Sequence, residues 1–306
     1  MKKLLIMIFI PFILALASCK GEKGGGDSVY SFTDALGRKV EIHSFDRTVV
    51  LSGSLAEIWQ LAGGEIYGTT NDAFERGIID LSGNEKKYGG VQSIATERLI
   101  ADGADFVILS ANISSQVKLG KMLESAGMTI AYFDVETFDD YLKALKICTD
   151  ITGREDLYVK NGEEISGKVE KAKKSASGKE APKILLLRAI STGMKALGSD
   201  NMTGSMLGDL GCINIADSES SLLESISLEA VVREDPDYIF ITTIGDSEAG
   251  LAQYRAELLS NPAWQQLGAV KNGRVHILPK ELYHYKPNVR WDEAYINLYN
   301  ILYETE

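Results

Sequence analysis

Residues 154–179 read REDLYVKNGEEISGKVEKAKKSASGK, and they organise the rest of the chain. The stretch contains no proline, and roughly half of its residues are charged. Apolar and small side chains recur every three or four residues, as on a helix that rests one face on a core, at Tyr158, Gly162, Ile165, Val169, Ala172 and Ala176. Gly162 and Gly167 each lower helix propensity by about 1 kcal/mol relative to alanine, so packing has to hold this helix. An ordinary solvated surface helix would show the same pattern, and the surrounding passages decide between the two.

Two similar passages flank this stretch. Residues 95–109 read ATERLIADGADFVIL, and residues 227–241 read SLEAVVREDPDYIFI. Each begins as a short helix with a glutamate in its first turn and then passes through a turn and an aspartate into an apolar run of strand character. The glutamate and the aspartate have the same separation in both passages, and the repeat is much longer than a solenoid period. We therefore expect two α/β lobes of similar design, with residues 154–179 as the helix that bridges them.

Strands and helices alternate along the rest of the chain with short connections, which is typical of α/β folds with parallel sheets. We expect an N-terminal lobe over residues 29–153 and a C-terminal lobe over residues 180–306. Tyr30–Thr33 and Lys39–Ile42 predict a hairpin. The other expected strands are 48–51, 66–70, 106–109, 129–133, 182–188, 195–197, 238–241 and 274–278, and the other expected helices are 55–62, 114–126, 138–152, 203–210, 247–259 and 288–303. Residues 71–90 are expected to form a looser loop.

The first residues have the features of an export signal. Two lysines precede an apolar run over residues 4–17, which is too short to span a bilayer comfortably. The run ends in Leu16-Ala17-Ser18-Cys19, which resembles the bacterial lipobox, where cleavage precedes a cysteine that is then diacylated. We expect residues 1–19 to be the signal, residues 20–28 to be a flexible tether, and the mature protein to be anchored through Cys19 to the outer face of a membrane in the cell envelope. A plain signal peptide with an incidental cysteine is the alternative.

Composition and motifs exclude several classes of function. The chain has 306 residues and a net charge of −11, which argues against a nucleic-acid partner held by phosphate contacts. It has no P-loop, no dinucleotide fingerprint and no Gly-x-Ser-x-Gly motif. His43, His276 and His284 lie far apart, and none has a second ligand at metal spacing, so we predict neither a metal site nor a cofactor. Cys148 and Cys212 could form a disulfide in an oxidising compartment, but we favour two buried thiols.

Two segments could contact a ligand. Ser52-Gly53-Ser54 begins a helix, where free N–H groups could hold an anion or the serines could serve as caps. The segment 282–291 concentrates Tyr283, His284, Tyr285, Lys286 and Arg290 between a strand and the last helix. Aromatic rings offer flat apolar contact, and cations pair with carboxylates or phosphates, so this mixture suits a bulky, partly anionic ligand. A helix start near Pro287 with solvated cations is the alternative.

These features together resemble the substrate-binding lipoproteins of ABC importers for iron–siderophores, haem and cobalamin. The resemblance rests on the lipobox, the hairpin turn Asp34-Ala35-Leu36-Gly37-Arg38, the two glutamate-headed passages, the long middle helix, and the late run from Asn261-Pro262-Ala263-Trp264 to Ala269-Val270-Lys271-Asn272-Gly273-Arg274-Val275. It covers essentially the whole mature chain. It implies two α/β lobes that face each other across a shallow cleft, one bridging helix, small hinge motion, and a binding protein in place of an enzyme.

The resemblance also implies partners and sites. In that family a glutamate on each lobe docks onto arginines of the membrane permease, and the matching positions here are Glu97 and Glu229; the helix dipole alone would also favour acids there. The implied partners are a permease with its ATPase and a bulky metal chelate, and we expect a monomer. Cleft loops vary with the cargo, so the ligand residues follow from the rule that α/β ligands lie beyond the carboxyl ends of strands. These candidates are Phe74, Arg76, Asn112, Arg188, Asn201, Thr243, Tyr283, Tyr285, Lys286 and Arg290.

Three alternatives stay open from the sequence. A receptor for free Zn or Mn would resemble this family in its bridging helix, but such receptors use several histidines, which are scarce here. An exported enzyme could use a carboxylate pair that includes Asp72 or Asp134, although nothing in the sequence fixes their geometry. A surface adhesion or scaffold lipoprotein would make the cleft incidental.

Overall fold

A parallel sheet forms the centre of the N-terminal lobe. The computed structural model describes residues 30–219, 221–224 and 226–304, so the predicted export signal, Cys19 and the predicted tether lie outside the described residues. The sheet has the order β5-β4-β3-β8-β9, and every neighbouring pair is parallel. Its strands are β3 (Thr48–Val50), β4 (Gly68–Thr69), β5 (Lys86–Lys87), β8 (Phe106–Ser110) and β9 (Thr129–Phe133). β3 is fully buried, and β8 is buried apart from its last residue, as the apolar runs in the sequence predict.

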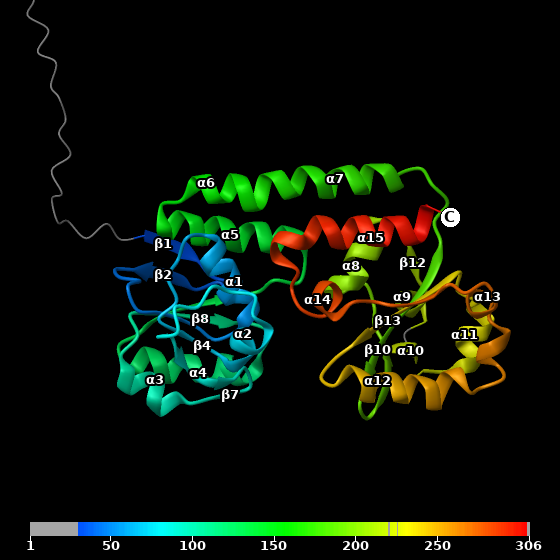
Figure 1. Cartoon of the computed structure of the whole chain (residues 1–306), viewed down its shortest axis with the longest axis horizontal. Coiled ribbons are helices and arrows are strands. Elements are labelled where there is room, and N and C mark those ends of the chain that lie inside the picture. The colour runs from blue at the N-terminus through cyan, green and yellow to red at the C-terminus, as the bar shows by residue number, and fades with distance from the viewer. Residues whose placement is uncertain (1–29, 220, 225, 305–306) are drawn as a thin grey trace, which may run out of the picture.

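Helices cover this sheet on both faces (Figure 1). They are α1 (Gly53–Leu61), α2 (Asn71–Arg76), α3 (Thr96–Asp102), α4 (Ser114–Ser125) and α5 (Phe138–Thr152). The prediction of a loose loop over residues 71–90 is wrong. This stretch holds α2, β5 and β6 (Gly89–Gly90), and β6 pairs with β7 (Ser93–Ile94). α2 buries only Ala73, so it is too short to show an apolar period, and Asp72 and Arg76 favour it through the helix dipole.

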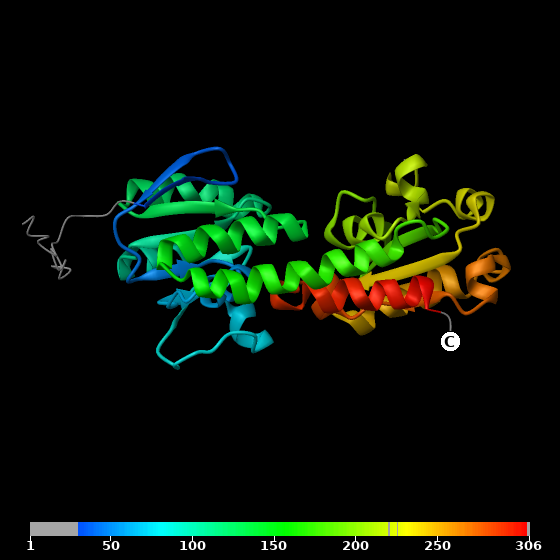
Figure 2. The ribbon, with the colours of Figure 1, turned by 90° about the horizontal axis from the view of Figure 1, so that it is seen from above.

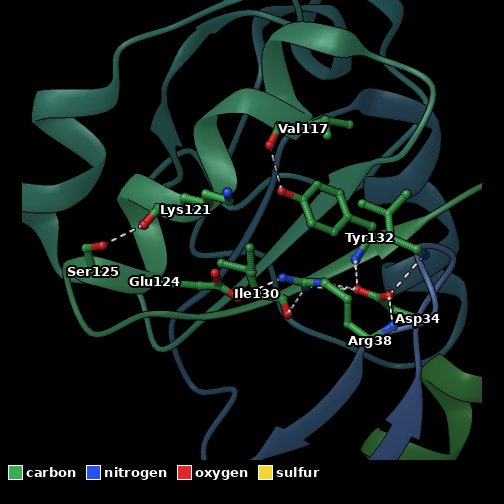
Figure 3. Close-up of polar contacts among 9 residues, drawn as sticks. Asp34, Arg38, Val117, Lys121, Glu124, Ser125, Ile130 and Tyr132 are labelled. Atoms are coloured by element: carbon green, nitrogen blue, oxygen red, sulfur yellow. Dashed lines mark hydrogen bonds and ion pairs between the residues drawn. The ribbon is translucent and has the colours of Figure 1, made fainter.

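The predicted hairpin, β1 (Tyr30–Thr33) and β2 (Lys39–Ile42), is confirmed, and its turn is fastened to the lobe. The buried Asp34 carboxylate accepts hydrogen bonds from Arg38 Nε at 2.9 Å and from the backbone N–H of Tyr132 at 3.2 Å (Figure 3). Arg38 in turn pairs with Glu124 at 2.7 Å and lies over the Tyr132 ring, 4.6 Å from its centroid. Gly37 takes the left-handed conformation that the turn needs, with φ 74°. This turn therefore has a structural role, and its residues line neither of the two cleft hollows described below.

One nearly continuous helix bridges the lobes, as residues 154–179 predict. α6 (Glu155–Tyr158), a π-helical turn over Val159–Glu163 and α7 (Glu164–Ala176) follow one another without a break. Ile165, Val169, Ala172 and Ala176 are buried, which confirms the apolar stripe. Figure 2 shows this helix extending from one lobe to the other.

The two ends of the bridge are tied to different lobes. In the π-helical turn, Asn161 donates to the Leu61 carbonyl at 2.9 Å and accepts from Tyr141 Oη at 2.8 Å, so this end is held by the N-terminal lobe. α7 packs along α15 (Trp291–Tyr303), and Lys168 pairs with Asp292 at 2.8 Å. The bridge is therefore attached to both lobes by specific contacts.

The C-terminal lobe has a mixed sheet of order β11-β10-β13-β14. β10 (Lys183–Ile190) pairs antiparallel with β11 (Gly193–Ala196) and parallel with β13 (Tyr238–Thr243) and with the short β12 (Ile213–Asn214), and β13 pairs parallel with β14 (Val275–Ile277). The helices are α8 (Met202–Asp209), α9 (Ile215–Ser218), α10 (Ser221–Glu224), α11 (Leu228–Glu234), α12 (Ser247–Tyr254) with a π-helical turn over Arg255–Leu259, α13 (Gly268–Lys271) and α14 (Lys280–Tyr283); short 3₁₀ turns lie at Trp264–Gln266 and Asn288–Arg290. The predicted last helix thus starts as a 3₁₀ turn and becomes α-helical at Trp291.

A single apolar cluster runs through the joint between the lobes. Phe138 of α5 lies 5.6 Å from Trp291 and 6.5 Å from Tyr295, measured between ring centroids, and both of these are in α15. An interface of this apolar kind opposes large relative motion, in line with the small hinge motion that the family resemblance implies. The α/β fold with two lobes and one bridging helix is confirmed. None of the helices within the described ranges combines the length and the hydropathy that crossing a bilayer requires.

Candidate functional site

A cleft lies where the carboxyl ends of the N-terminal strands face the C-terminal lobe. One hollow of about 260 Å³ is lined from the N-terminal lobe by residues that include Ser54, Arg76, Asn112 and Glu136, and from the C-terminal lobe by His284, Tyr285 and Lys286. A neighbouring hollow of about 460 Å³ shares Arg76, Tyr285 and Lys286 and adds Glu57, Lys280, Glu281 and Arg290 among others. The position follows the rule for α/β sheets that guided the sequence prediction.

Local structure explains why these side chains meet. α2 follows β4 directly and carries Arg76 in its last turn. Asn112 lies just beyond β8, and Glu136 lies just beyond β9. On the facing lobe, α14 follows β14 and ends at Tyr283, so His284, Tyr285 and Lys286 come from the segment that leaves this short helix.

Arg76 and Tyr285 form a contact between the two lobes. The guanidinium carbon of Arg76 lies 4.0 Å from the centroid of the Tyr285 ring, and Nη1 of the same residue donates to Ser54 Oγ at 2.9 Å. Lys280 Nζ lies 5.2 Å from the same ring centroid. Burial lowers the pKa of Arg76, and the carboxylates of Glu57 and Asp72 oppose that shift. An aromatic ring flanked by cations can hold a flat, anionic ligand.

Lys286 and Glu136 form an ion pair across the cleft. The distance from Nζ to Oε1 is 2.8 Å. Asn112 Nδ2 donates to the same Glu136 oxygen at 2.8 Å and to Asp134 Oδ1 at 2.5 Å. Burial raises the pKa of Asp134, and the neighbouring carboxylates of Glu136 and Asp140 add to that shift. The N-terminal wall of the cleft is therefore acidic here, opposite cations of the other lobe.

Arg188 and His284 each have a buried nitrogen without a hydrogen-bond partner. These atoms are Nε of Arg188 and Nδ1 of His284. Burial lowers the pKa of His284 to about 4, and the positive charges of Arg188, Lys280, Lys286 and Arg76 act in the same direction. The imidazole is therefore neutral near pH 7. Buried polar atoms are nearly always paired in folded proteins, so unpaired ones beside a cleft favour a ligand that supplies the partner.

The anion site considered at Ser52-Gly53-Ser54 is occupied by the protein itself. The backbone N–H of Gly53 donates to Asp72 Oδ2 at 2.9 Å, and the other oxygen of Asp72 accepts from Thr70 Oγ1 at 2.5 Å. An internal carboxylate thus takes the place at this helix start that an external anion would need.

Several predicted ligand residues do not line either hollow, and Arg188 of β10 is one of them. Asn201 is the N-cap of α8 and accepts from the Gly204 N–H at 3.2 Å. Tyr283 is 2% exposed, and its hydroxyl donates to the Ala294 carbonyl at 2.9 Å, so it is a core residue. Thr243 is buried with its hydroxyl 2.9 Å from that of Ser247, and the ring of Phe74 lies under Lys87 Nζ at 4.3 Å.

The sequence prediction brings together one part of the site and misses another. Arg76, Asn112, Tyr285 and Lys286 line the first hollow, whereas Arg290 lines only the second and pairs with Glu293 at 2.7 Å. The prediction did not name Glu136, Lys280 or Glu57. Glu136 could have been found, because it follows a predicted strand end closely, as Asn112 does. No pattern in the sequence indicates that Glu57 of α1 would reach Asn288, whose Nδ2 donates to it at 2.6 Å.

Neither the cysteines nor the histidines assemble into a metal-binding cluster in the part of the chain that the structure describes. No group of three or more His, Cys, Asp or Glu side chains there could hold a metal ion. Cys148 and Cys212 are both free thiols, the first buried and the second partly buried. His276 lies in β14, and its ring stacks against Tyr238 and Phe240 of the neighbouring strand β13. It is therefore a residue of the sheet, as expected.

The two glutamates predicted to dock onto a permease are both exposed. Glu97 lies in the first turn of α3 and Glu229 in the first turn of α11. Each helix precedes a central strand of its own sheet, β8 in one lobe and β13 in the other.

Two facing lobes, a bridging helix and a polar cleft between the lobes define a solute-binding protein. The chain belongs to the periplasmic binding protein family, whose model matches residues 49–282. The family predicted from the sequence is thereby confirmed, and it is a family of solute-binding proteins and not of enzymes.

Individual relatives are more distant. The chain is 26% identical over 131 residues to IsdE, a high-affinity heme uptake system protein of Staphylococcus aureus (strain MRSA252), and that match spans 43% of this chain and 45% of IsdE, less than half of either protein. The fold of this chain is similar to that of FeuA from Bacillus subtilis, a triscatecholate siderophore binding protein complexed with ferri-bacillibactin (TM-score 0.70, 18% identity, 90% of this chain, 99% of that chain). It is also similar to an ABC transporter substrate-binding protein of Listeria monocytogenes EGD-e (TM-score 0.71, 17% identity, 85% of this chain, 99% of that chain).

Proposed function

We propose that this protein captures a bulky, anionic metal chelate in the cleft between its lobes and delivers it to the permease of an ABC importer. The cargo class is a ferric siderophore, haem or a cobalamin-like corrinoid. The observation that carries the proposal is a set of cations in a protein with a net charge of −11: Arg76, Lys280 and Lys286 line the hollows, and Arg188 lies near enough for its charge to act on His284. Two of these four, Arg188 and Arg76, are partly buried, which strengthens their attraction for an anion.

The size and the charged lining of the cleft support a chelate over a bare ion. The two hollows measure about 260 and 460 Å³ and share one wall, and ligand pockets commonly measure about 300–1,000 Å³. A small cation would face the cations of the C-terminal wall, Lys280 and Lys286, and would find no cluster of metal ligands among the described residues. We therefore favour the chelate over free Zn or Mn, the alternative from the sequence. IsdE, named for heme uptake, and FeuA, named for siderophore binding, both point to this class of cargo.

Binding titrations of the purified mature protein test this proposal. Haem, a ferric tricatecholate, a corrinoid, Zn²⁺ and Mn²⁺ are each added, and binding is followed by absorbance or calorimetry. One of the three chelates should bind far more tightly than either ion. Tight binding of Zn²⁺ or Mn²⁺ with no response to any chelate would reject the proposal.

A tyrosine substitution locates the binding to the cleft. Tyr285→Ala removes the ring that lies against Arg76 and should weaken chelate binding by about 1–3 kcal/mol. Tyr67→Ala is the matched control, because its ring also has a cation nearby, Lys86 Nζ at 5.3 Å from the centroid, but it lies outside both hollows. Equal losses in the two variants would mean that the cleft is not the binding site.

Membrane attachment through Cys19 is a separate part of the proposal, and it rests on the lipobox in the sequence. A diacylated cysteine supplies two chains, whereas a single chain would anchor only marginally. Cys19→Ala should therefore move the protein from the membrane fraction to the soluble fraction of cells that express it. Unchanged partitioning on fractionation would reject the anchor.

A further inference from the structure

Lys286 reaches across the cleft to an acid of the opposite wall. Lys286 lies in the segment after α14, whereas Glu136 lies between β9 and α5 of the other lobe. Their charged atoms are 2.8 Å apart, and the two side chains are 22% and 36% exposed. Both residues line the same hollow. The pair therefore occupies space that a ligand between the lobes has to enter.

The charge of Glu136 also acts on Arg188, a cation of β10 in the same lobe as Lys286. Glu136 is the carboxylate whose charge opposes the burial-driven fall in the pKa of Arg188. It makes no hydrogen bond to the Arg188 Nε, which is buried without a partner. One internal carboxylate thus balances Lys286 by contact and Arg188 only from a distance, so the positive charge of the C-terminal wall is incompletely neutralised.

The contacts of Glu136 allow its carboxylate to separate from Lys286. Its Oε1 accepts from both Lys286 and Asn112, and Asn112 belongs to the same lobe as Glu136. If Lys286 turned to another anion, Glu136 would keep its hydrogen bond from Asn112 and gain water through its exposed portion. Separating a partly exposed ion pair of this kind costs little, about 0–1 kcal/mol.

We propose that Glu136 is an internal counter-ion of the ligand site, displaced from Lys286 by a carboxylate or comparable oxyanion of the cargo. This inference rests on the proposed function and names the anionic group that the cleft selects. A ligand without such an anion cannot replace Glu136, so it gains nothing from Lys286 or Arg188. Glu136 therefore competes with every anionic ligand and moderates its affinity, and it re-pairs with Lys286 when the ligand leaves.

Glu136→Gln tests the inference, because it removes the competing charge and keeps the shape. The probes are haem, which carries two carboxylates, and its uncharged dimethyl ester, both followed by absorbance titration of the full mature chain. We expect Glu136→Gln to bind haem roughly fivefold more tightly, which corresponds to about 1 kcal/mol, and to bind the ester as the wild type does. Glu65→Gln, an exposed acid of the same lobe, is the control for net charge and should change neither.

A double-mutant cycle and a measurement without ligand complete the test. Lys286→Met should weaken haem binding and should largely remove the gain from Glu136→Gln, because the two substitutions act on one contact. In the ligand-free protein, Glu136→Gln should speed the acylation of Lys286, measured by mass spectrometry, and leave Lys143 unchanged. A wild type that binds haem, with no gain or a loss in Glu136→Gln, would overturn the inference and leave the proposed function standing. A wild type that binds none of haem, a ferric tricatecholate or a corrinoid would overturn both.

Discussion

The two similar passages of the sequence fold into the same structural unit in the two lobes. β8 lies beside β3, and β13 lies beside β10, in each case at the centre of a sheet. Asp105 and the residue before β3, Arg47, exchange hydrogen bonds: the Arg47 N–H donates to the carboxylate at 3.1 Å, and the Asp105 N–H donates to the Arg47 carbonyl at 3.1 Å. Asp237 and Lys183, the first residue of β10, do the same at 2.8 Å and 2.8 Å. We call each of these paired contacts, Asp105 with Arg47 and Asp237 with Lys183, a clamp. Each clamp fixes where two neighbouring parallel strands start, and the shared spacing in the sequence places its aspartate.

The units differ where they meet the rest of the lobe. α3 begins after Ala95, which has no capping side chain, whereas Ser227 caps α11 by accepting from the Ala230 N–H at 3.3 Å. β8 leads to Asn112 in the cleft, whereas β13 ends at Thr243, whose hydroxyl pairs with Ser247. The parts that build the sheet are alike, and the parts that face the cargo are not. This comparison predicts one partner shared by both lobes and a ligand site that is asymmetric.

The largest expected effect concerns the glutamates that head the two units. If Glu97 and Glu229 each grip an arginine of the permease, Glu97→Ala with Glu229→Ala removes two charge-assisted contacts of about 1–1.5 kcal/mol each. Docking should then weaken by roughly 30- to 150-fold, and uptake of labelled cargo by cells should fall while ligand affinity stays unchanged. Each single variant should lose less, and salt should narrow the difference between the wild type and the variants, because screening weakens the same contacts in the wild type.

Glu65→Ala with Glu180→Ala is the matched control, with one exposed acid removed near each sheet. It changes the net charge equally and should leave uptake at the wild-type level. Normal uptake by the Glu97 and Glu229 double variant would show that these acids serve only the helix dipole.

The next effect is on the stability of the protein. It concerns the joint between the two lobes, which lies outside both repeated units. Burial raises the pKa of Glu57 in α1 from 4.5 to about 7, although Asn288, Arg76 and Arg290 act in the opposite direction. Between these two values the folded protein binds more protons than the unfolded chain, so the free energy of unfolding should fall as the pH rises through this interval. The total fall from Glu57 should be on the order of 3 kcal/mol.

Glu57→Gln should remove this fall, since a neutral amide can also pair with Asn288. Denaturant unfolding at pH 5 and pH 8 measures it: the variant should gain stability over the wild type at pH 8 and match it more closely at pH 5. The same decrease with pH in Glu57→Gln as in the wild type would show that other groups cause it. Glu65→Gln, which is exposed, should follow the wild type at both pH values.

Much of the fold could be predicted from the sequence because it depends on local patterns. Period and spacing indicated the bridging helix, and the apolar runs indicated β8 and β13. The cleft was harder, because a rule about strand ends finds positions but not orientations. It selected Arg76 and Lys286, which line the cleft, yet it also selected Tyr283, whose side chain turns into the core to reach the Ala294 carbonyl. The contact between Glu136 and Lys286 joins two lobes that no local pattern relates.

A smaller effect separates the two clamps. Asp105 also accepts from the Arg47 guanidinium at 2.5 Å and from Ser44 Oγ at 3.2 Å, and these contacts are absent at Asp237 in the described structure. Arg47 holds the pKa of Asp105 below its usual value, so this stabilisation is present near pH 7 and is lost as the pH falls. Asp105→Ala should lower the free energy of unfolding by about 1.5–3 kcal/mol and Asp237→Ala by about 1 kcal/mol, measured in urea at pH 7. Equal losses would mean that only the shared backbone contact matters.

The smallest effect concerns the caps of the two helices that carry the proposed docking acids. Ser227→Ala should lower the free energy of unfolding by about 0.5–1 kcal/mol, since it leaves the Ala230 N–H without its acceptor. Ala95→Ser is the reciprocal change and should raise that free energy, but by less, because Ala95 has ψ 71° where Ser227 has ψ 110°. Denaturant unfolding of both variants measures the pair. A gain at residue 95 as large as the loss at residue 227 would mean that the two helix starts differ only in a side chain. No gain at all would mean that the backbone at Ala95 itself departs from capping geometry, and the likeness of the two units would then begin only after their first turn.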